Sequence, residues 1–305
     1  MMYVLLVVGF VLLIKGADYF VDGSSSIARI LKVPSVVIGL TIVAAGTSAP
    51  EAAVSITAGL AGNSDISLGN IVGSNLFNLL MVIGISAITC PVVSQKEILK
   101  RDMWWNIGVS AALLMLIRDH KISRIEGVIL LALMAVYLFV VIRSAMKNRV
   151  QDDSLKCMSV PKSILAIALG LGAIIFGGNL VVDNASLIAK AWGMSDTLVG
   201  LTIVAVGTSL PELVTSIVAA KKGDSGIALG NAVGSCIFNI LFILGMSSVL
   251  SPIHAVTELV IDTGILIVVN ALMFIFAQTK KETSRLEGVF CIACYLAYSM
   301  YIIMR

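Results

Sequence analysis

The chain contains an internal duplication. An offset of 161 residues, which is the separation of Glu51 from Glu212, aligns residues 9–142 with the second half without a gap. The segment GLTIVAAGTSAPE at 39–51 matches GLTIVAVGTSLPE at 200–212 except at positions 45/206 and 49/210. LGNIVGSNLFN at 68–78 and LGNAVGSCIFN at 229–239 form a second matching pair. We therefore expect two homologous halves with the same fold.

Apolar runs fill nearly the whole of each half. The chain is 58% hydrophobic and 13% charged, whereas soluble domains are about 25% charged. A helix needs about 20 apolar residues to cross a bilayer. The runs predict an all-α integral membrane protein with ten transmembrane helices, near residues 2–28, 35–59, 67–89, 98–118, 124–143, 162–189, 196–220, 228–250, 257–278 and 285–303.

Five helices per half fix the relative orientation of the halves. An odd number makes the second half enter the membrane from the opposite side, so the repeats are expected to have inverted topology. We predict an N-terminal repeat at 1–145, a cytoplasmic linker at 146–161 and a C-terminal repeat at 162–305. The linker is the only long hydrophilic connection.

The basic residues orient this arrangement. Of 21 Lys and Arg, Lys15 lies within the first run and only five fall in the loops and tail expected outside: Arg118, Lys121, Arg124, Lys190 and Arg305. The positive-inside rule then places both termini on the extracytoplasmic side of a multi-pass cell-membrane protein. The lipid bilayer is the expected surrounding, a monomer is the expected state, and nothing in the sequence suggests a nucleic-acid partner.

Several chemistries lack their residues. Cys291 and Cys294 form a C-x-x-C pattern on an expected membrane helix, but no second ligand pair completes a zinc site. There is no H-E-x-x-H sequence and no histidine within an expected span, so hydrolysis has no evident base. We expect no enzyme activity and no resident cofactor.

The repeated GTSxPE segment interrupts a membrane-spanning helix. Pro50 cannot donate a backbone hydrogen bond and clashes with the preceding turn, so carbonyls around residues 44–48 are expected to be unpaired. In lipid, each unpaired group costs several kcal/mol unless a polar partner or a cation replaces the lost bond.

Glu51 and Glu212 have two alternative explanations. S-A-P-E and S-L-P-E fit a capping box, in which Ser48 and Ser209 pair with these glutamates at helix N-termini. However, an ionised glutamate at the bilayer centre costs at least about 2.5–3.5 kcal/mol, and capping is worth only about 1 kcal/mol. Since inverted repeats bring equivalent mid-span positions together, we expect the two carboxylates to meet near the midplane.

The second repeated motif supplies neutral oxygens. Ser74 and Asn78 lie one helical turn apart on one face, as do Ser235 and Asn239. We expect these four at the same site, and we expect Asn70 and Asn231 to serve helix packing instead. Two carboxylates with amide, hydroxyl and carbonyl oxygens suit calcium, or alternatively two to three sodium ions, better than zinc or copper.

Other intramembrane acids fit a simpler role. Asp18, Asp22 and Asp183 lie near Lys15 or near expected loop ends, so we expect interfacial or packing groups there.

The doubled pattern G-T-S-x-P-E followed by G-N-x-x-G-S-x-x-x-N resembles the two alpha repeats of the sodium/calcium exchanger family, within the cation/calcium antiporter superfamily. The resemblance covers essentially the whole chain and is closest to compact prokaryotic members, without large cytoplasmic calcium-sensing domains. It implies a secondary active antiporter that exchanges sodium for calcium by alternating access.

The resemblance also implies a ligand set. Calcium would be held by Glu51 and Glu212 with the carbonyls of Thr47 and Thr208. Sodium would use the carbonyls of Ala44 and Ala205 and the side chains of Ser48, Ser209, Ser74, Ser235, Asn78 and Asn239. Many exchangers have an aspartate where this chain has Asn239, which leaves the sodium stoichiometry and any potassium transport open. Exchange of protons for calcium or another divalent cation, or a cation channel, are the alternatives.

Overall fold

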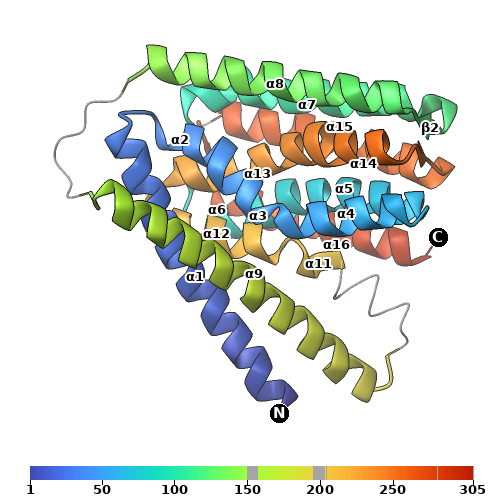
Figure 1. The fold of residues 1–305 in the computed structure, drawn as a ribbon, viewed down its shortest axis with the longest axis horizontal. Coiled ribbons are helices and arrows are strands. Elements are labelled where there is room, and N and C mark those ends of the chain that lie inside the picture. Colours follow the sequence, from blue (N-terminus) through green and yellow to red (C-terminus); the bar gives the residue numbers. More distant parts are fainter. Residues whose placement is uncertain (150–156, 195–202, 204, 280, 305) are drawn as a thin grey trace.

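A computed structural model describes residues 1–149, 157–194, 203, 205–279 and 281–304. These residues form an almost entirely helical protein (Figure 1). Parts of the expected linker at 146–161 and of the expected span at 196–220 lie outside the described residues.

The elements of the first half follow the chain from α1 to α8. They are α1 (Met2–Ile30), α2 (Ser35–Ile38), the π-helix η1 (Gly39–Val43), α3 (Ala44–Thr47), α4 (Ala49–Leu60), α5 (Ser64–Phe77), the π-helix η2 (Asn78–Val82), α6 (Ile83–Thr89), β1 (Val92–Val93), the π-helix η3 (Ile98–Asp102), α7 (Met103–Leu116), the 3-10 helix η4 (Ile117–Asp119), β2 (Lys121–Ile122) and α8 (Arg124–Lys147).

The described elements of the second half follow in a corresponding order, with the single helix α15 in place of η3 and α7. It contains α9 (Val160–Ala191), α11 (Ala205–Gly207), α12 (Leu210–Lys221), α13 (Ser225–Phe238), the π-helix η6 (Asn239–Leu244), α14 (Gly245–Leu250), β3 (Ile253–His254), α15 (Thr257–Thr279), β4 (Glu282–Thr283) and α16 (Arg285–Met304).

Long apolar helices dominate the described residues. Seven are long and apolar enough to cross a membrane, and the pair Ser35–Thr47 and Ala49–Leu60 would form an eighth span with a 50° bend. The expected span at 98–118 is divided between η3 and α7. The membrane-protein class is therefore confirmed, and the ten-helix layout stays a prediction.

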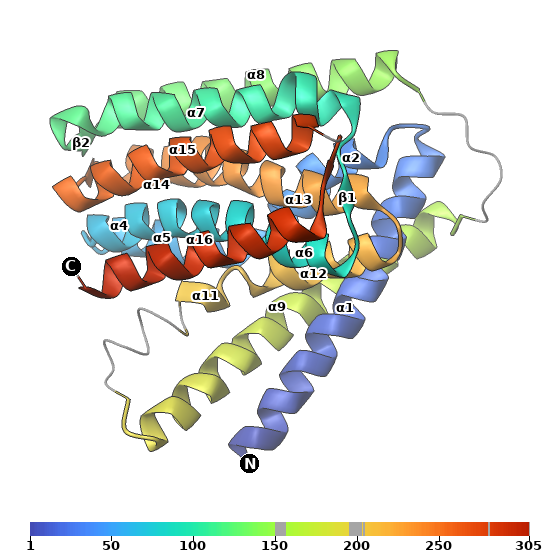
Figure 2. The ribbon, with the colours of Figure 1, turned by 180° about the vertical axis from the view of Figure 1, so that it is seen from behind.

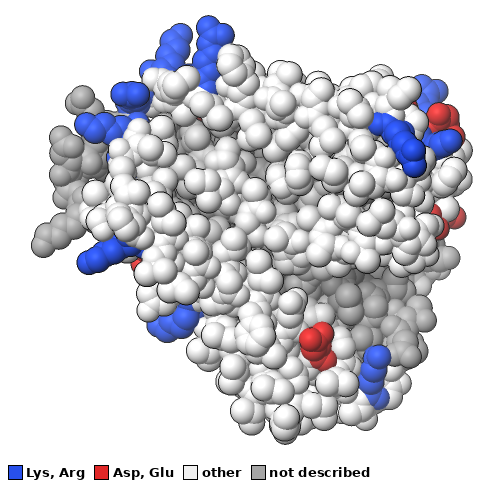
Figure 3. All heavy atoms as spheres, viewed as in Figure 1, with Lys and Arg blue, Asp and Glu red and all other residues white. Residues whose placement is uncertain are grey.

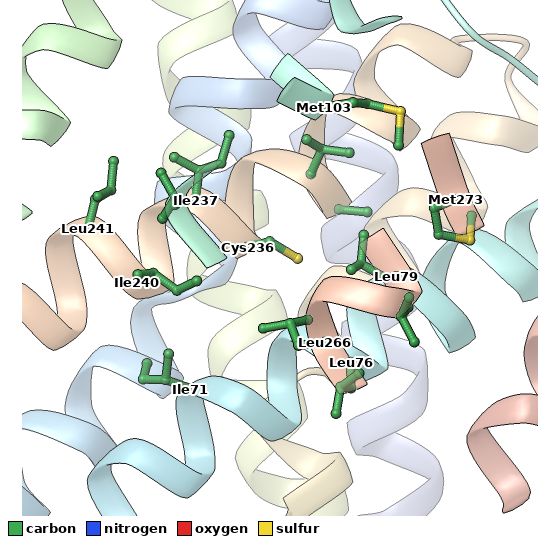
Figure 4. Packing of buried hydrophobic residues seen from close by; sticks show 14 of the residues in the cluster. Ile71, Leu76, Leu79, Met103, Cys236, Ile237, Ile240, Leu241, Leu266 and Met273 are labelled. Carbon is green, nitrogen blue, oxygen red and sulfur yellow. The ribbon is translucent and has the colours of Figure 1, made fainter. Parts of the chain in front are cut away.

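Two groups of helices make up the molecule. α1 and α9 cross each other at one side, and the other long helices run side by side in a bundle (Figures 1 and 2). The main apolar core lies inside the bundle, where α5, η2, α13 and η6 contribute Leu76, Leu79, Cys236 and Ile240 (Figure 4). A second cluster joins α1 and α9 to α12 and the start of α13.

Glycines allow α1 and α9 to cross at close range. A Cβ atom placed on Gly16 would lie 2.8 Å from the Gly170 carbonyl oxygen, and one on Gly9 would lie 2.9 Å from the Gly177 carbonyl oxygen. Because Gly9 is equivalent to Gly170 and Gly16 to Gly177 in the repeat, the contacts are reciprocal. The two backbones touch where any larger residue would separate them.

Other contacts between the halves are reciprocal as well. β1 pairs with β4 and its repeat equivalent β3 pairs with β2, both antiparallel. α6 packs on α16 through Gly84 and Gly288, and the equivalent helices α14 and α8 pack through Gly245 and Gly127. Each half therefore covers the other with the same set of elements.

Capping boxes begin two of the long helices. Ser123 and Glu126 form a complete capping box at the start of α8, and the equivalent Ser284 and Glu287 exchange the same bonds at α16. On the face shown in Figure 3, charged side chains gather mainly at two margins and the surface between them is largely uncharged. This distribution suits a protein whose middle faces lipid.

Candidate ion-binding site

The GTSAPE segment bends its helix at Ser48. Ser48 has φ −80° and ψ 10°, and it separates α3 from α4, which has Pro50 in its first turn. The expectation of an unpaired carbonyl at Ala44 was wrong, because that oxygen accepts the Ser48 N–H at 3.0 Å. The physical reason is the spacing: the N–H that Pro50 lacks would have bonded to Gly46.

The second half has the same break. Ser209, with φ −91° and ψ 7°, separates α11 from α12, and Pro211 lies in the first turn of α12. The Ser209 N–H bonds to the Val206 carbonyl at 3.2 Å. Ala205, the equivalent of Ala44, is the first residue of α11.

Glu51 and Glu212 are both 0% exposed and are joined through serines of the opposite half. The Ser48 hydroxyl donates to Glu212 Oε1 at 2.9 Å, and the Ser209 hydroxyl donates to Glu51 Oε1 at 2.8 Å. Neither serine caps its own helix through its side chain. The capping-box alternative is therefore wrong for these residues, and the breaks of the two halves face each other.

The serines of the second motif complete the surroundings of the carboxylates. Ser74 donates to Glu51 Oε1 and Ser235 donates to Glu212 Oε1, both at 3.5 Å. Each carboxylate therefore receives one hydroxyl from its own half and one from the other half.

Several buried polar atoms of this cluster lack a hydrogen-bond partner among the described residues. They are Oε2 of both glutamates, the Thr208 hydroxyl, both amide atoms of Asn78 and the amide oxygen of Asn239. An unpaired buried polar group costs about 1–3 kcal/mol, and a charged one costs more. Most of these atoms are oxygens, which a hard cation would satisfy.

Asn70 and Asn231 act as packing residues, as expected. Asn70 Nδ2 bonds to the Ser55 hydroxyl at 2.9 Å and to the Glu51 carbonyl at 3.4 Å. Asn231 makes the equivalent bonds to Ser216 and to the Glu212 carbonyl. These bonds hold each glutamate-bearing helix against the helix of the second motif.

Two residues near the site have roles that the sequence did not predict. Asn231 Oδ1 also accepts the Thr47 hydroxyl at 2.9 Å, which links Thr47 to the opposite half. Asn75, next to Ser74, bonds to both Asn239 and the Cys236 carbonyl. The sequence offers one sign of the role of Asn75: its repeat equivalent is Cys236, so the two halves differ at this position.

A cavity of about 290 Å³ adjoins one side of the site. Thr208, Pro50 and Pro211 line it together with Ala49, Ala53 and Asp183. The repeat equivalents of Ala49 and Ala53 are the larger Leu210 and Val214, and they pack against the second core cluster, which includes Phe20. The cavity therefore reaches the site beside Ala49 and Ala53 of the first half. At the equivalent positions of the second half, the side chains of Leu210 and Val214 fill the space.

Asp18, Asp22 and Asp183 are the aspartates that we expected to be interfacial or packing groups. Lys222 Nζ contacts Asp22 Oδ1 at 2.7 Å and Asp18 Oδ1 at 3.4 Å. Asp183 is exposed at the cavity. Among the described residues no three His, Cys, Asp or Glu side chains are grouped as metal ligands. A bound ion would depend on the two glutamates with neutral oxygens.

Comparisons with known proteins agree with this geometry. The family described as "Sodium/calcium exchanger protein" matches residues 1–143 and 162–304. The chain is 34% identical to the sodium/calcium exchanger MaX1 of Methanosarcina acetivorans, over 97% of each protein. It is 35% identical to the inner membrane protein YrbG of Escherichia coli, over 81% of this chain and 79% of YrbG.

A solved structure has the same fold. The sodium-calcium exchanger NCX_Mj, soaked with zero Na⁺ and Ca²⁺, superposes with a TM-score of 0.88 and 32% identity, over 99% of this chain and 98% of that chain. The chain therefore belongs to the sodium/calcium exchanger family.

Proposed function

We propose that this protein is a secondary active antiporter that exchanges sodium for calcium across the cell membrane. The observation that carries the proposal is the pair of fully buried glutamates, each hydrogen-bonded by a serine of the opposite half. Its relatives named sodium/calcium exchangers support the same activity and give no support to an enzyme.

The donor set supports calcium and sodium as the transported ions. Calcium accepts carboxylate, amide, hydroxyl and carbonyl oxygens in flexible geometry, whereas magnesium demands a stricter octahedron. We assign calcium to Glu51, Glu212 and the carbonyls of Thr47 and Thr208. We assign sodium to the carbonyls of Ala44 and Ala205 and to the side chains of Ser48, Ser209, Ser74, Ser235, Asn78 and Asn239.

Charge balance explains why exchange is obligatory. One calcium ion neutralises two carboxylates, and sodium ions can do the same. An empty site leaves two buried negative charges close together, and moving them through a low-dielectric interior is unfavourable. The empty carrier therefore stays on one side of the membrane, and only the loaded carrier crosses between states.

Alternating access requires a site that opens to one side at a time. The proposed architecture has ten transmembrane helices in inverted repeats, 1–145 and 162–305, joined by a cytoplasmic linker, with both termini outside. The reciprocal strand pairs and helix contacts support it. The cavity beside Thr208 and the packed Leu210 and Val214 support a state open on one side, which the topology makes the outside.

The crossing helices α1 and α9 are the proposed gates. Glycine backbone forms the closest points of their contact, and close backbone approach without interlocking side chains at these points allows one helix to slide along the other. Since each helix also packs on α12 or on the break segments, sliding would cover one entrance and uncover the other.

Two rival functions are less well supported. Proton/calcium exchange has the same carboxylates available, but the matched family and the relative MaX1 are named for sodium. A cation channel usually gathers its pore from several subunits, whereas two facing halves in one chain suit a carrier that we expect to be monomeric.

Uptake of radioactive calcium into proteoliposomes tests the proposal. An outward sodium gradient should drive uptake, and equal potassium or proton gradients should not. Glu51→Gln and Glu212→Gln should abolish sodium-driven uptake while the purified proteins keep their helical content. Proton-driven uptake in the wild type, or uptake in either variant at the wild-type rate, would overturn the assignment.

A further inference from the structure

Asn75 is a fully buried amide on α5 that the ligand set does not include. Its Nδ2 donates to the Cys236 carbonyl at 3.1 Å, and its Oδ1 accepts from Asn239 Nδ2 at 3.0 Å. The Cys236 thiol lies 3.6 Å from the Asn75 carbonyl, so two bonds join the same pair of residues in opposite directions. Asn75 thus connects α5 of the first half to α13 and η6 of the second.

The direction of these bonds is fixed by the Cys236 carbonyl. A carbonyl can only accept, so Asn75 must turn its NH₂ group toward Cys236 and its oxygen toward Asn239. Asn239 must then turn its own NH₂ group toward Asn75. The Asn239 oxygen is left facing the other way, and it is a buried atom without a hydrogen-bond partner among the described residues.

The face of the helix that carries Asn239 also carries Ser235. Ser235 is one turn earlier and donates to Glu212 Oε1. We propose that Asn75 is a positioning residue that aims the amide oxygen of Asn239 at the transported cation. This inference rests on the proposed function and adds to the machinery a residue at a position of the second motif where the two halves differ.

The two halves differ at this position. The repeat equivalent of Asn75 is Cys236, which has no amide to orient Asn78. Both amide atoms of Asn78 are buried and unpaired among the described residues. One amide of the site is therefore held with its oxygen available, whereas the other is not held by a side chain.

The fixed orientation matters because the two ends of an amide act oppositely on a cation. The oxygen attracts the ion, and the NH₂ group repels it and cannot coordinate it. Asn75→Leu removes the acceptor that holds the Asn239 NH₂ group, so the amide can rotate. We expect the half-saturating calcium concentration to rise about tenfold, with a much smaller change in the maximal rate.

Testing Asn75→Leu in a protein that also carries Asn239→Asp shows whether Asn75 orients the Asn239 amide or only stabilises the fold. In Asn239→Asp the carboxylate has two equivalent oxygens and no N–H, so there is nothing to orient. Asn75→Leu should then raise the half-saturating calcium concentration no more than about twofold relative to Asn239→Asp alone. Asn184→Leu on α9 is the matched control, because Asn184 is also buried and, among the described residues, its side chain bonds to the Leu180 carbonyl of its own helix.

The experiment measures calcium binding by titration calorimetry and sodium-driven uptake for the wild type, Asn75→Leu, Asn239→Asp, the double variant and the control. When Asn75→Leu weakens binding about tenfold with Asn239 intact and no more than about twofold in the Asn239→Asp background, the proposal is supported. Equal losses in both backgrounds, or no loss in either, overturn it. Failure of the proposed function would be recognised separately, by a wild type that takes up no calcium under a sodium gradient.

Discussion

One added methyl group tests whether the close contact between α1 and α9 depends on its glycines. A Cβ atom on Gly170 would lie 2.6 Å from the Phe20 nitrogen and 2.7 Å from the Gly16 carbonyl oxygen. Both are backbone atoms, so one helix must move by several tenths of an ångström. Overpacking of this kind costs about 1–3 kcal/mol, and alanine regains about 0.5–1 kcal/mol of helix propensity.

The difference between these two terms predicts that Gly170→Ala destabilises the protein by up to about 2.5 kcal/mol. At about 2–4 °C per kcal/mol, the thermal unfolding midpoint should fall by up to roughly 10 °C. If α1 slides along α9 during transport, the rate of sodium-driven calcium uptake should fall as well.

Gly172→Ala is the matched control. It lies on the same helix two residues away, and no described residue comes within 4 Å of its added Cβ atom. This variant should be as stable as the wild type or slightly more stable, with unchanged uptake. Thermal unfolding in detergent and uptake in proteoliposomes measure both effects. Equal unfolding midpoints for the two variants would refute the argument from the crossing.

Three further predictions concern polar contacts. Ser48→Ala and Ser209→Ala each remove a hydroxyl donor to a buried carboxylate. Each should lower the free energy of unfolding of the ion-free protein by about 1.5–3 kcal/mol. Clearly unequal losses for the two variants would contradict the reciprocal geometry. Asp102 accepts two hydrogen bonds from the Arg101 guanidinium, at 2.8 and 3.0 Å, so Asp102→Ala leaves this cation without its buried partner and should lower the free energy of unfolding by about 3–5 kcal/mol. A loss below about 1 kcal/mol in thermal unfolding would show that the pair is solvated. Lys222→Ala removes the contacts with the partly exposed Asp18 and Asp22, so the free energy of unfolding at low salt should fall by no more than about 1 kcal/mol. The same loss at about 1 M salt would contradict an ion pair that solvent screens.

The duplication made the helical membrane-protein class and the facing pair of buried glutamates predictable. A strict match between 39–51 and 200–212 placed two prolines and two glutamates at equivalent mid-span positions, and hydrocarbon left few explanations for such residues. The apolar runs gave the approximate positions of the long helices. They could not show that residues 98–116 begin as a π-helix, because helix type depends on packing.

Local pattern alone failed to separate a cap from an ion site. The sequence S-x-x-E recurs in both halves at 48–51 with 209–212 and at 123–126 with 284–287. The pairs at 123–126 and 284–287 are true capping boxes. The other two pairs have proline between serine and glutamate, and their serines bond across to the opposite half. The spacing S-x-x-E is the same in both kinds of pair, and the contact between the halves shows that they form different bonds.

The role of Asn75 was equally hidden in the sequence. It lies outside the positions shared by the two motifs, since its repeat equivalent is Cys236. A comparison of the two halves identifies the residues that they share and gives no role to residues that differ between them. Its bonds to Cys236 and Asn239 join residues far apart in the chain, which no spacing rule predicts.

Calcium binding to the purified protein tests the paired carboxylates most directly. Titration calorimetry of the wild type should show one calcium ion bound per chain, in competition with sodium. Glu51→Gln and Glu212→Gln should each weaken binding at least about a hundredfold, or about 2.7 kcal/mol. Glu126→Gln should bind as the wild type does, because glutamine also completes a capping box. Wild-type affinity for calcium in either the Glu51 or the Glu212 variant would contradict a site built from both halves.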